Sequence, residues 1–329
     1  MEGATARQPS SSEAVIRTLL ERKIEDGELQ LPVLSTVVTE VLDLTRSNDS
    51  SAGQLSDIIH RDQTLAGHVL RVANSPLYLP NMPIVSLQQA ISRLGLRIIG
   101  EVAVALSVKE IAFDVRGYED EVRFLWRHAA AAGGFAREIA RHLRSSVESA
   151  LLCGLLQNVG KPVLLQLIRE ASDQLGEELD KESTLSIVED YHTLVGSRMA
   201  GAWGLPEVVA TAVHFHHDPA SAPKYQDQTR ITGLSDILAN HLLGVDPSVM
   251  HGRAPGLTLL ERPASTDQAP KEGGDDDGGA GAMSASISEL SSRLADEHPD
   301  FAELGMYPED VAALLARSDQ IRETMEIFG

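Results

Sequence analysis

The feature that most constrains the fold of this chain is the recurrence of apolar residues at helical spacing. The clearest run steps by three or four residues through Leu185, Val188, His192, Val195, Met199 and Trp203. Such steps place side chains on one face of an α-helix. Aromatic residues make up only 4% of the sequence, so aliphatic side chains must fill the core. We therefore expect an all-α fold rather than an aromatic-rich β-sandwich.

The same spacing predicts further helices along most of the chain. The predicted segments are about 13–26, 31–44, 54–60, 64–74, two helices that meet near Gly95, 120–143, 147–157, 183–202, 205–217 and 230–243. Between 74 and 86, Pro76, Pro80 and Pro83 predict an ordered loop, because proline lacks a backbone donor and disrupts a helix interior.

Composition divides the chain into four parts. Residues 1–12 are polar and predict a disordered tail, whereas 13–262 carry the patterned, folded domain. Residues 263–286 are rich in Gly, Ser, Ala and Asp and predict a flexible acidic linker, since they bury too little apolar surface to offset the entropy of ordering. Amphipathic spacing returns in 287–329, which we expect to be an acidic helical C-terminal segment.

Charge argues against one class of partner. The chain has 28 Lys and Arg against 48 Asp and Glu, a formal net charge of −20, and a surface this acidic repels nucleic acid and anionic lipid. The segment 263–329 alone holds 4 basic and 15 acidic side chains. With a polar start and no stretch approaching about 20 apolar residues, the sequence predicts a cytoplasmic protein without membrane insertion.

Several catalytic motifs are absent from the sequence. The run 154–162 approaches a phosphate-binding loop, but five residues separate its glycines and Pro162 follows Lys161 where a Ser or Thr is needed. There is no G-x-S-x-G elbow, no CxxC pair and no HExxH helix. The single cysteine, Cys153, lies in an apolar run and predicts a buried structural thiol.

Two groups of polar residues are interpreted as structural. Asn74 and Ser75 lie at a helix end, where such residues cap free backbone groups, although contact with a partner or ligand is the alternative. Arg137, Arg141 and Arg144 recur at roughly helical spacing and predict a solvated helix face.

The histidines are the remaining candidates for chemistry. His214, His216 and His217 cluster at the end of an apolar helix, and His128 and His192 lie on apolar faces. Imidazoles from several helices, joined by carboxylates, suit Mn, Fe, Zn or Mg sites that activate water for phosphoester hydrolysis. The alternative is that each histidine is an ordinary hydrogen-bonded core or boundary residue.

Together with further motifs along the chain, these residues resemble a known family, the HDOD domain. The first half of the resemblance consists of Ile58-Ile59-His60-Arg61-Asp62-Gln63-Thr64-Leu65, Leu70-Arg71-Val72-Ala73-Asn74-Ser75 and Ala90-Ile91-Ser92-Arg93-Leu94-Gly95. The second half consists of Trp126-Arg127-His128, Gly154-Leu155-Leu156, Gly160-Lys161, His192, Val195-Gly196, Trp203-Gly204-Leu205-Pro206 and His216-His217. The matches keep their order over about residues 28–240. The resemblance implies an all-helical bundle similar to HD phosphohydrolases and a role in bacterial signalling.

Departures from the catalytic relatives bear on mechanism. Where catalytic HD enzymes carry their His-Asp pair, this chain has Gln157 and Asn158, which removes an imidazole donor and a negative charge together. Nor does a Gly-Tyr-Pro motif follow His217, as it does in cyclic-dinucleotide phosphodiesterases of the group. The resemblance places other former ligand positions at His128, His192, His217 and Asp236, with His216 interchangeable with His217. We therefore expect a vestigial pocket with no catalytic residue, metal or cofactor.

Three functions stay open, of which the first is favoured. It is a non-catalytic regulatory or scaffold module that binds protein partners in a signalling pathway, with the linker and acidic helices as a second contact element. The second is a metal-dependent phosphohydrolase of a nucleotide or cyclic dinucleotide. The third is a sensor that binds a nucleotide second messenger in the former active-site pocket.

Overall fold

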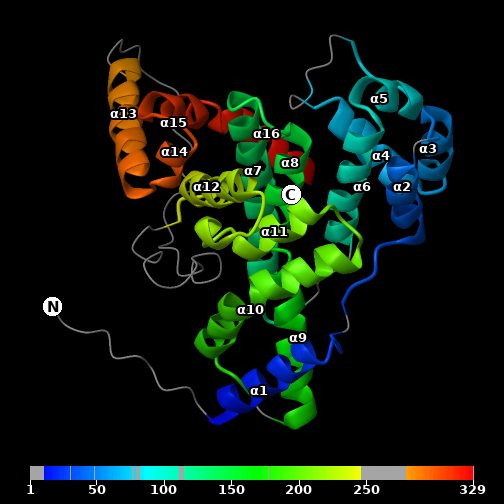
Figure 1. Ribbon diagram of the computed structural model, residues 1–329, viewed down its shortest axis with the longest axis vertical. Coiled ribbons are helices and arrows are strands. Elements are labelled where there is room, and N and C mark those ends of the chain that lie inside the picture. Colours follow the sequence, from blue (N-terminus) through cyan, green and yellow to red (C-terminus); the bar gives the residue numbers. More distant parts are fainter. Residues whose placement is uncertain are drawn as a thin grey trace.

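The fold is known from a computed structural model, which describes residues 11–29, 31–47, 49–75, 78, 82–110, 115–176, 178–245 and 279–328. In these ranges all regular secondary structure is helical (Figure 1). The expectation of an all-α bundle is therefore confirmed.

The N-terminal helices form two groups. Helix α1 (Ser11–Glu25) packs on α9 and α10, far from the others. The second group, on one side of the molecule in Figure 1, consists of α2 (Thr36–Arg46), α3 (Ala52–Ile59), α4 (Gln63–Ala73), α5 (Leu87–Leu94) and α6 (Leu96–Glu110). Helices α2 to α5 each begin after a Ser or Asp whose side chain accepts a hydrogen bond from a backbone N–H of the first turn, which explains where they start.

The second half of the domain is built around a long central helix. This is α7 (Glu119–His142), which packs against α8 and α12. The other elements are α8 (Val147–Leu156), α9 (Gly160–Leu175), α10 (Lys181–Ala202), α11 (Glu207–Phe215), the short 3-10 helix η1 (Pro219–Ser221) and α12 (Gln226–Leu242).

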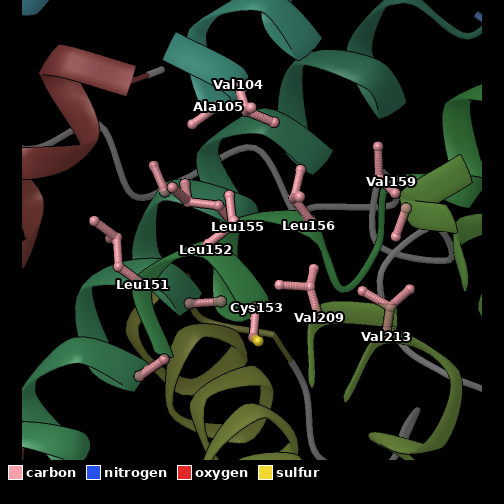
Figure 2. Close-up of a cluster of buried hydrophobic side chains, with 14 of the residues drawn as sticks. Val104, Ala105, Leu151, Leu152, Cys153, Leu155, Leu156, Val159, Val209 and Val213 are labelled. Atoms are coloured by element: carbon pink, nitrogen blue, oxygen red, sulfur yellow. The ribbon is translucent and has the colours of Figure 1, made fainter. Parts of the chain in front are cut away.

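The apolar run that contains Cys153 lies in the core, as predicted. Figure 2 shows Cys153 beside Leu152 and Leu156 of α8, with Val209 and Val213 of α11 on the facing side. The thiol is completely buried, and this burial raises its pKa far above the ordinary value. Cys153 is thus a packing residue.

Helix α9 was not among the predicted helices. The run 154–162, which approaches a phosphate-binding loop in sequence, is the corner where α8 ends and α9 begins. Pro162 occupies the third position of α9, within the first turn, where a missing backbone N–H costs no helical hydrogen bond.

One described stretch, Ser149–Leu175, is long and apolar enough to cross a membrane by length and composition alone. The expectation that no stretch approaches this length was therefore wrong. Its most apolar window is 94% buried inside the fold, as expected for core helices of the bundle.

The C-terminal segment is helical, as expected, but its boundary differs. Its helices are α13 (Gly279–Glu297), α14 (Asp300–Glu303), α15 (Pro308–Leu315) and α16 (Ser318–Phe328). Because α13 starts at Gly279, residues 279–286 of the expected linker are helical. The expected tail, residues 1–12, also extends too far, because α1 already begins at Ser11. The rest of the tail and of the linker, together with 246–262 of the expected domain, lies outside the described residues.

The acidic segment is docked on the domain rather than held away from it. In Figure 1, α13 to α15 lie across α7 from α2–α5, and α16 packs on α7, α4 and α6. Asp300 accepts from Arg230 Nε at 3.1 Å, and Arg317 pairs with Glu138 of α7. Ile321 is buried over Gly134. Part of the acidity of this segment therefore pairs with cations of the bundle.

Two glycines allow helices to meet at backbone distance. A Cβ on Gly160 would collide with the backbone carbonyl of His192, and one on Gly233 would lie 2.5 Å from the carbonyl oxygen of His216. No side chain can fit at either position, so α9 packs directly on α10, and α12 on the end of α11.

Replacing Gly160 should therefore be costly. We expect Gly160→Ala to lower the free energy of unfolding by about 2 kcal/mol or more, since backbone must move to admit the methyl group. Gly201→Ala is the matched control, because a Cβ at this exposed position on α10 meets nothing within 4 Å. It should leave stability unchanged or raise it by up to about 1 kcal/mol. Urea unfolding followed by circular dichroism measures both, and equal effects would contradict this account.

Candidate functional site

The residues of the expected pocket come from separate helices and meet at one place. His128 lies on α7, Gln157 and Asn158 at the corner between α8 and α9, His192 on α10, His216 and His217 at the end of α11, and Asp236 on α12. All except His217 are buried, and His217 reaches solvent.

Asp236 is the centre of the hydrogen bonds that join these helices. Its Oδ1 accepts from Gln157 Nε2 at 3.1 Å and from Asn158 Nδ2 at 3.2 Å. Its Oδ2 accepts from Asn240 Nδ2 at 3.0 Å, and Nε2 of His128 lies 3.5 Å from Oδ1. Neutral amides and an imidazole therefore compensate the charge of this buried carboxylate.

The other half of the site is a group of three imidazoles. Nδ1 of His192 lies 2.9 Å from the carbonyl oxygen of Glu189, and Nδ1 of His216 lies 2.9 Å from that of Val213. A carbonyl oxygen only accepts, so both Nδ1 atoms carry the proton and both Nε2 atoms present a lone pair when the rings are neutral. Nε2 of His192 faces Nε2 of His217 at 3.2 Å. One ligand atom from each ring lies within 4.8 Å of the others.

Burial sets the protonation of these groups. It lowers the pKa of His192 and His216 well below the ordinary value of histidine, and the charge of Lys161 adds to the effect on His192. Burial also lowers the pKa of His128, against the attraction of Asp236. For Asp236 burial acts to raise the pKa, but His128, the other imidazoles and Lys161 outweigh it, and its pKa is lowered. Burial therefore favours the neutral form of the imidazoles, and their attraction when protonated favours the ionised form of Asp236.

Three residues of the site were not predicted from the sequence. Lys161 is 2% exposed, and its Nζ lies 2.8 Å from Oε1 of Glu189, whose pKa burial raises. Asn240 binds Asp236 from one helical turn further along α12. A weak signal existed, because Asn240 follows Asp236 by four residues and Glu189 precedes His192 by three, which places each pair on one helix face.

The two halves of the site differ in how well they fit a divalent cation. Beside Asp236, the amide NH₂ groups of Gln157 and Asn158 point at the carboxylate, where a cation would need lone pairs. The imidazole group fits better, since Nδ1–H of His192 and of His216 is bound to a backbone carbonyl, which is the usual support of histidine ligands. Imidazole nitrogens of this kind would suit Zn²⁺ or Fe²⁺.

Several buried polar atoms of the site have no hydrogen-bond partner among the described residues. They are Nδ1 and Nε2 of His128, Oε1 of Gln157, Oδ1 of Asn158, Oε2 of Glu189, Nε2 of His216 and Oδ1 of Asn240. Such atoms are rare in folded proteins, and a cluster of them marks a place that takes a polar guest, whether water, an ion or a small ligand.

Solved structures share this fold. A Shewanella amazonensis protein provisionally named a metal-dependent phosphohydrolase superposes with a TM-score of 0.66, at 21% identity over 96% of this chain and 100% of its own. An HDOD domain protein of unknown function from Geobacter sulfurreducens gives 0.57, at 20% identity over 95% and 98%. A Marinobacter aquaeolei VT8 protein, provisionally named a signal transduction protein, gives 0.57, at 21% identity over 97% and 66%.

Sequence comparisons point the same way. An uncharacterised protein of Treponema pallidum (strain Nichols) is 27% identical over 218 residues, which are 63% of this chain and 41% of that relative. The chain thus spans less than half of the length of this relative. The sequence profile of the HDOD domain matches residues 31–219, more than half of the chain. The chain therefore belongs to the HDOD domain family.

Proposed function

We propose that this HDOD protein is a cytoplasmic regulatory module of bacterial signal transduction that acts through protein partners and does not hydrolyse phosphoesters. The observation that carries the proposal is the hydrogen bonding of Asp236. Amide groups of Gln157, Asn158 and Asn240 donate to both carboxylate oxygens, in the position where a hydrolytic metal centre needs ligands. The provisional name of the Marinobacter aquaeolei protein, a signal transduction protein, supports the same context.

In this proposal the buried carboxylate has a structural role. Asp236 joins α12 to the corner between α8 and α9, so its hydrogen bonds hold helices together around the former metal position. A fold that is stable without a metal ion suits a scaffold, because its partner surface then does not depend on metal supply.

Removing the carboxylate should therefore destabilise the protein. We expect Asp236→Ala to lower the free energy of unfolding by about 3 kcal/mol, since three buried amide donors lose their acceptor. Asp227→Ala is the matched control on the same helix, because its side chain is 84% exposed. Denaturant unfolding in the presence of a chelator measures both.

The opposite result would contradict the structural role. In a site built around a metal ion, the metal-free protein is destabilised by the cost of burying an acidic ligand whose charge is not compensated. Removing that ligand would then raise the free energy of unfolding of the metal-free protein. Equal or greater stability of Asp236→Ala would therefore favour a metal centre.

The second candidate function is a metal-dependent phosphohydrolase. The specific observation in its favour is the group of His192, His216 and His217, with one ligand atom from each within 4.8 Å of the others. The unpartnered buried atoms around it also indicate a polar guest. The provisional name of the Shewanella amazonensis protein is consistent with this alternative.

Metal analysis and a hydrolysis assay separate the two functions. We expect the purified protein to show no turnover of bis(p-nitrophenyl) phosphate with added Mn²⁺. We expect the double variant Gln157→His, Asn158→Asp to bind more Mn²⁺ than the native protein, because it adds an imidazole and a carboxylate beside Asp236. Inductively coupled plasma mass spectrometry measures the metal content.

The regulatory proposal would be overturned if the native protein hydrolysed the substrate and if this hydrolysis depended on the imidazole group. The decisive pattern is stoichiometric metal and hydrolysis that are lost in His192→Ala and kept in His214→Ala. His214 is a matched control because it lies on α11 near the site, with its ring against Phe215 and outside the imidazole group.

A further inference from the structure

The C-terminal helix α16 joins the two halves of the fold. It contacts α7 of the bundle and both α4 and α6 of the N-terminal group. Ile321 and Met325 are 3% and 7% exposed, and they lie four residues apart, on one face of the helix. This apolar face is therefore buried against the rest of the fold, at a place that we call the α16 site.

Two contacts fix how α16 lies on α7. Arg317, directly before α16, pairs with Glu138, and Ile321 lies over Gly134, where a Cβ would come within 3.1 Å of the isoleucine side chain. The two helices run antiparallel, because the contacts ascend from 317 to 321 on one side and descend from 138 to 134 on the other. Glu138 is 9% exposed, so its carboxylate is a charged anchor inside the site.

The helices around the α16 site are held by contacts that do not involve α16. Helix α7 packs against α8 and α12, and α4 and α6 pack against each other. At the end of α4, Asn74 Nδ2 donates to the Ile84 carbonyl oxygen at 2.8 Å and Asn74 Oδ1 accepts from the Ile84 N–H at 2.8 Å, so the interpretation of Asn74 as a structural residue agrees with its contacts. On α7, Arg137 is 6% exposed, which corrects the prediction that it lies on a solvated face with Arg141. We therefore expect the site to persist when α16 leaves it.

Charge opposes the docking of α16. Residues 1–245 have 22 basic and 31 acidic side chains, and residues 279–329, which contain α16, have 3 and 10. Both parts are negative and repel each other over the distance that salt leaves unscreened. A helix of 11 residues is also marginal on its own in water, so α16 depends on the contacts of its site. A helix with the same anchors and fewer acidic residues should therefore dock more tightly than α16.

We propose that the α16 site is a docking site for an amphipathic helix of a partner protein, and that α16 occupies it as an internal competitor. The partner helix carries two bulky aliphatic residues four positions apart, an arginine four positions before the first of them, and fewer acidic residues than α16. The arginine pairs with Glu138, and the aliphatic residues take the places of Ile321 and Met325. This inference rests on the proposed function, because it names the kind of protein partner that the regulatory module receives.

A peptide added to the full chain tests the proposal. The receptor is the double variant Ile321→Asp, Met325→Asp, in which α16 no longer docks, and the probe is a fluorescein-labelled peptide of residues 316–329. We expect fluorescence anisotropy to show binding with a Kd of about 100 µM or below. The native chain should bind the peptide at least about tenfold more weakly, because its own α16 leaves only a small fraction of the sites free. A peptide that carries Ile321→Asp should not bind.

Further variants assign the peptide to the α16 site. In the double variant, Gly134→Leu adds a side chain where Ile321 lies in the native chain, and this change should abolish binding. Gly201→Leu is the matched control on α10, because a Cβ there meets nothing within 4 Å, and it should leave the affinity unchanged. Circular dichroism checks that each variant is folded. Absence of binding by a folded double variant, or binding that Gly134→Leu does not weaken, would overturn the proposal.

Hydrogen exchange in the native chain tests the displacement of α16 without a variant. We expect amides of α16 to exchange at least about a hundredfold faster than those in the middle of α7, because α16 leaves its site while the bundle stays folded. Equal protection would contradict the role of internal competitor. A concentration-dependent dimer that Ile321→Asp abolishes would place a second copy of the chain in the site, which also contradicts the proposal. Phosphoester hydrolysis by the native protein would overturn the proposed function while leaving the peptide affinity unchanged, so the two failures are distinguishable.

Discussion

Direct backbone contact between helices is the constraint on which the site depends. It occurs where Gly160 meets His192 and where Gly233 meets His216, and any side chain there would force the helices apart. The same contacts bring the corner between α8 and α9 against α10, and α12 against the end of α11. The hydrogen bonds of Asp236 to Gln157 and Asn158, at 3.1 and 3.2 Å, then join α12 to the same corner.

Charge compensation follows from this close packing. A carboxylate as deeply buried as Asp236 needs donors on both oxygens, and the amides of Gln157, Asn158 and Asn240 supply them. The buried Lys161 is paired with Glu189 in the same way. The imidazole group is arranged differently, because Nε2 of His192 and Nε2 of His216 present lone pairs when the rings are neutral, and that of His192 accepts from Nε2 of His217 at 3.2 Å. Amide donors therefore face the carboxylate in one half of the site, whereas lone pairs of His192 and His216 are present in the other.

Helix α7 connects the functional regions. It carries His128 of the candidate site and Glu138, which pairs with Arg317 of the C-terminal segment. The acidic segment that looks like a free tether in sequence is therefore packed on the helix that carries His128 of the candidate site.

The sequence by itself determined the all-α class, most helix positions and the group of residues around Asp236, because helical periodicity is local and the family motifs keep their order. It missed α9, and it extended the linker over the start of α13. Only the tertiary structure decided that Arg137 is buried and that Lys161 pairs with Glu189, 28 residues away. The physical reason is that burial and charge pairing depend on which helices pack together, and no local pattern encodes that choice.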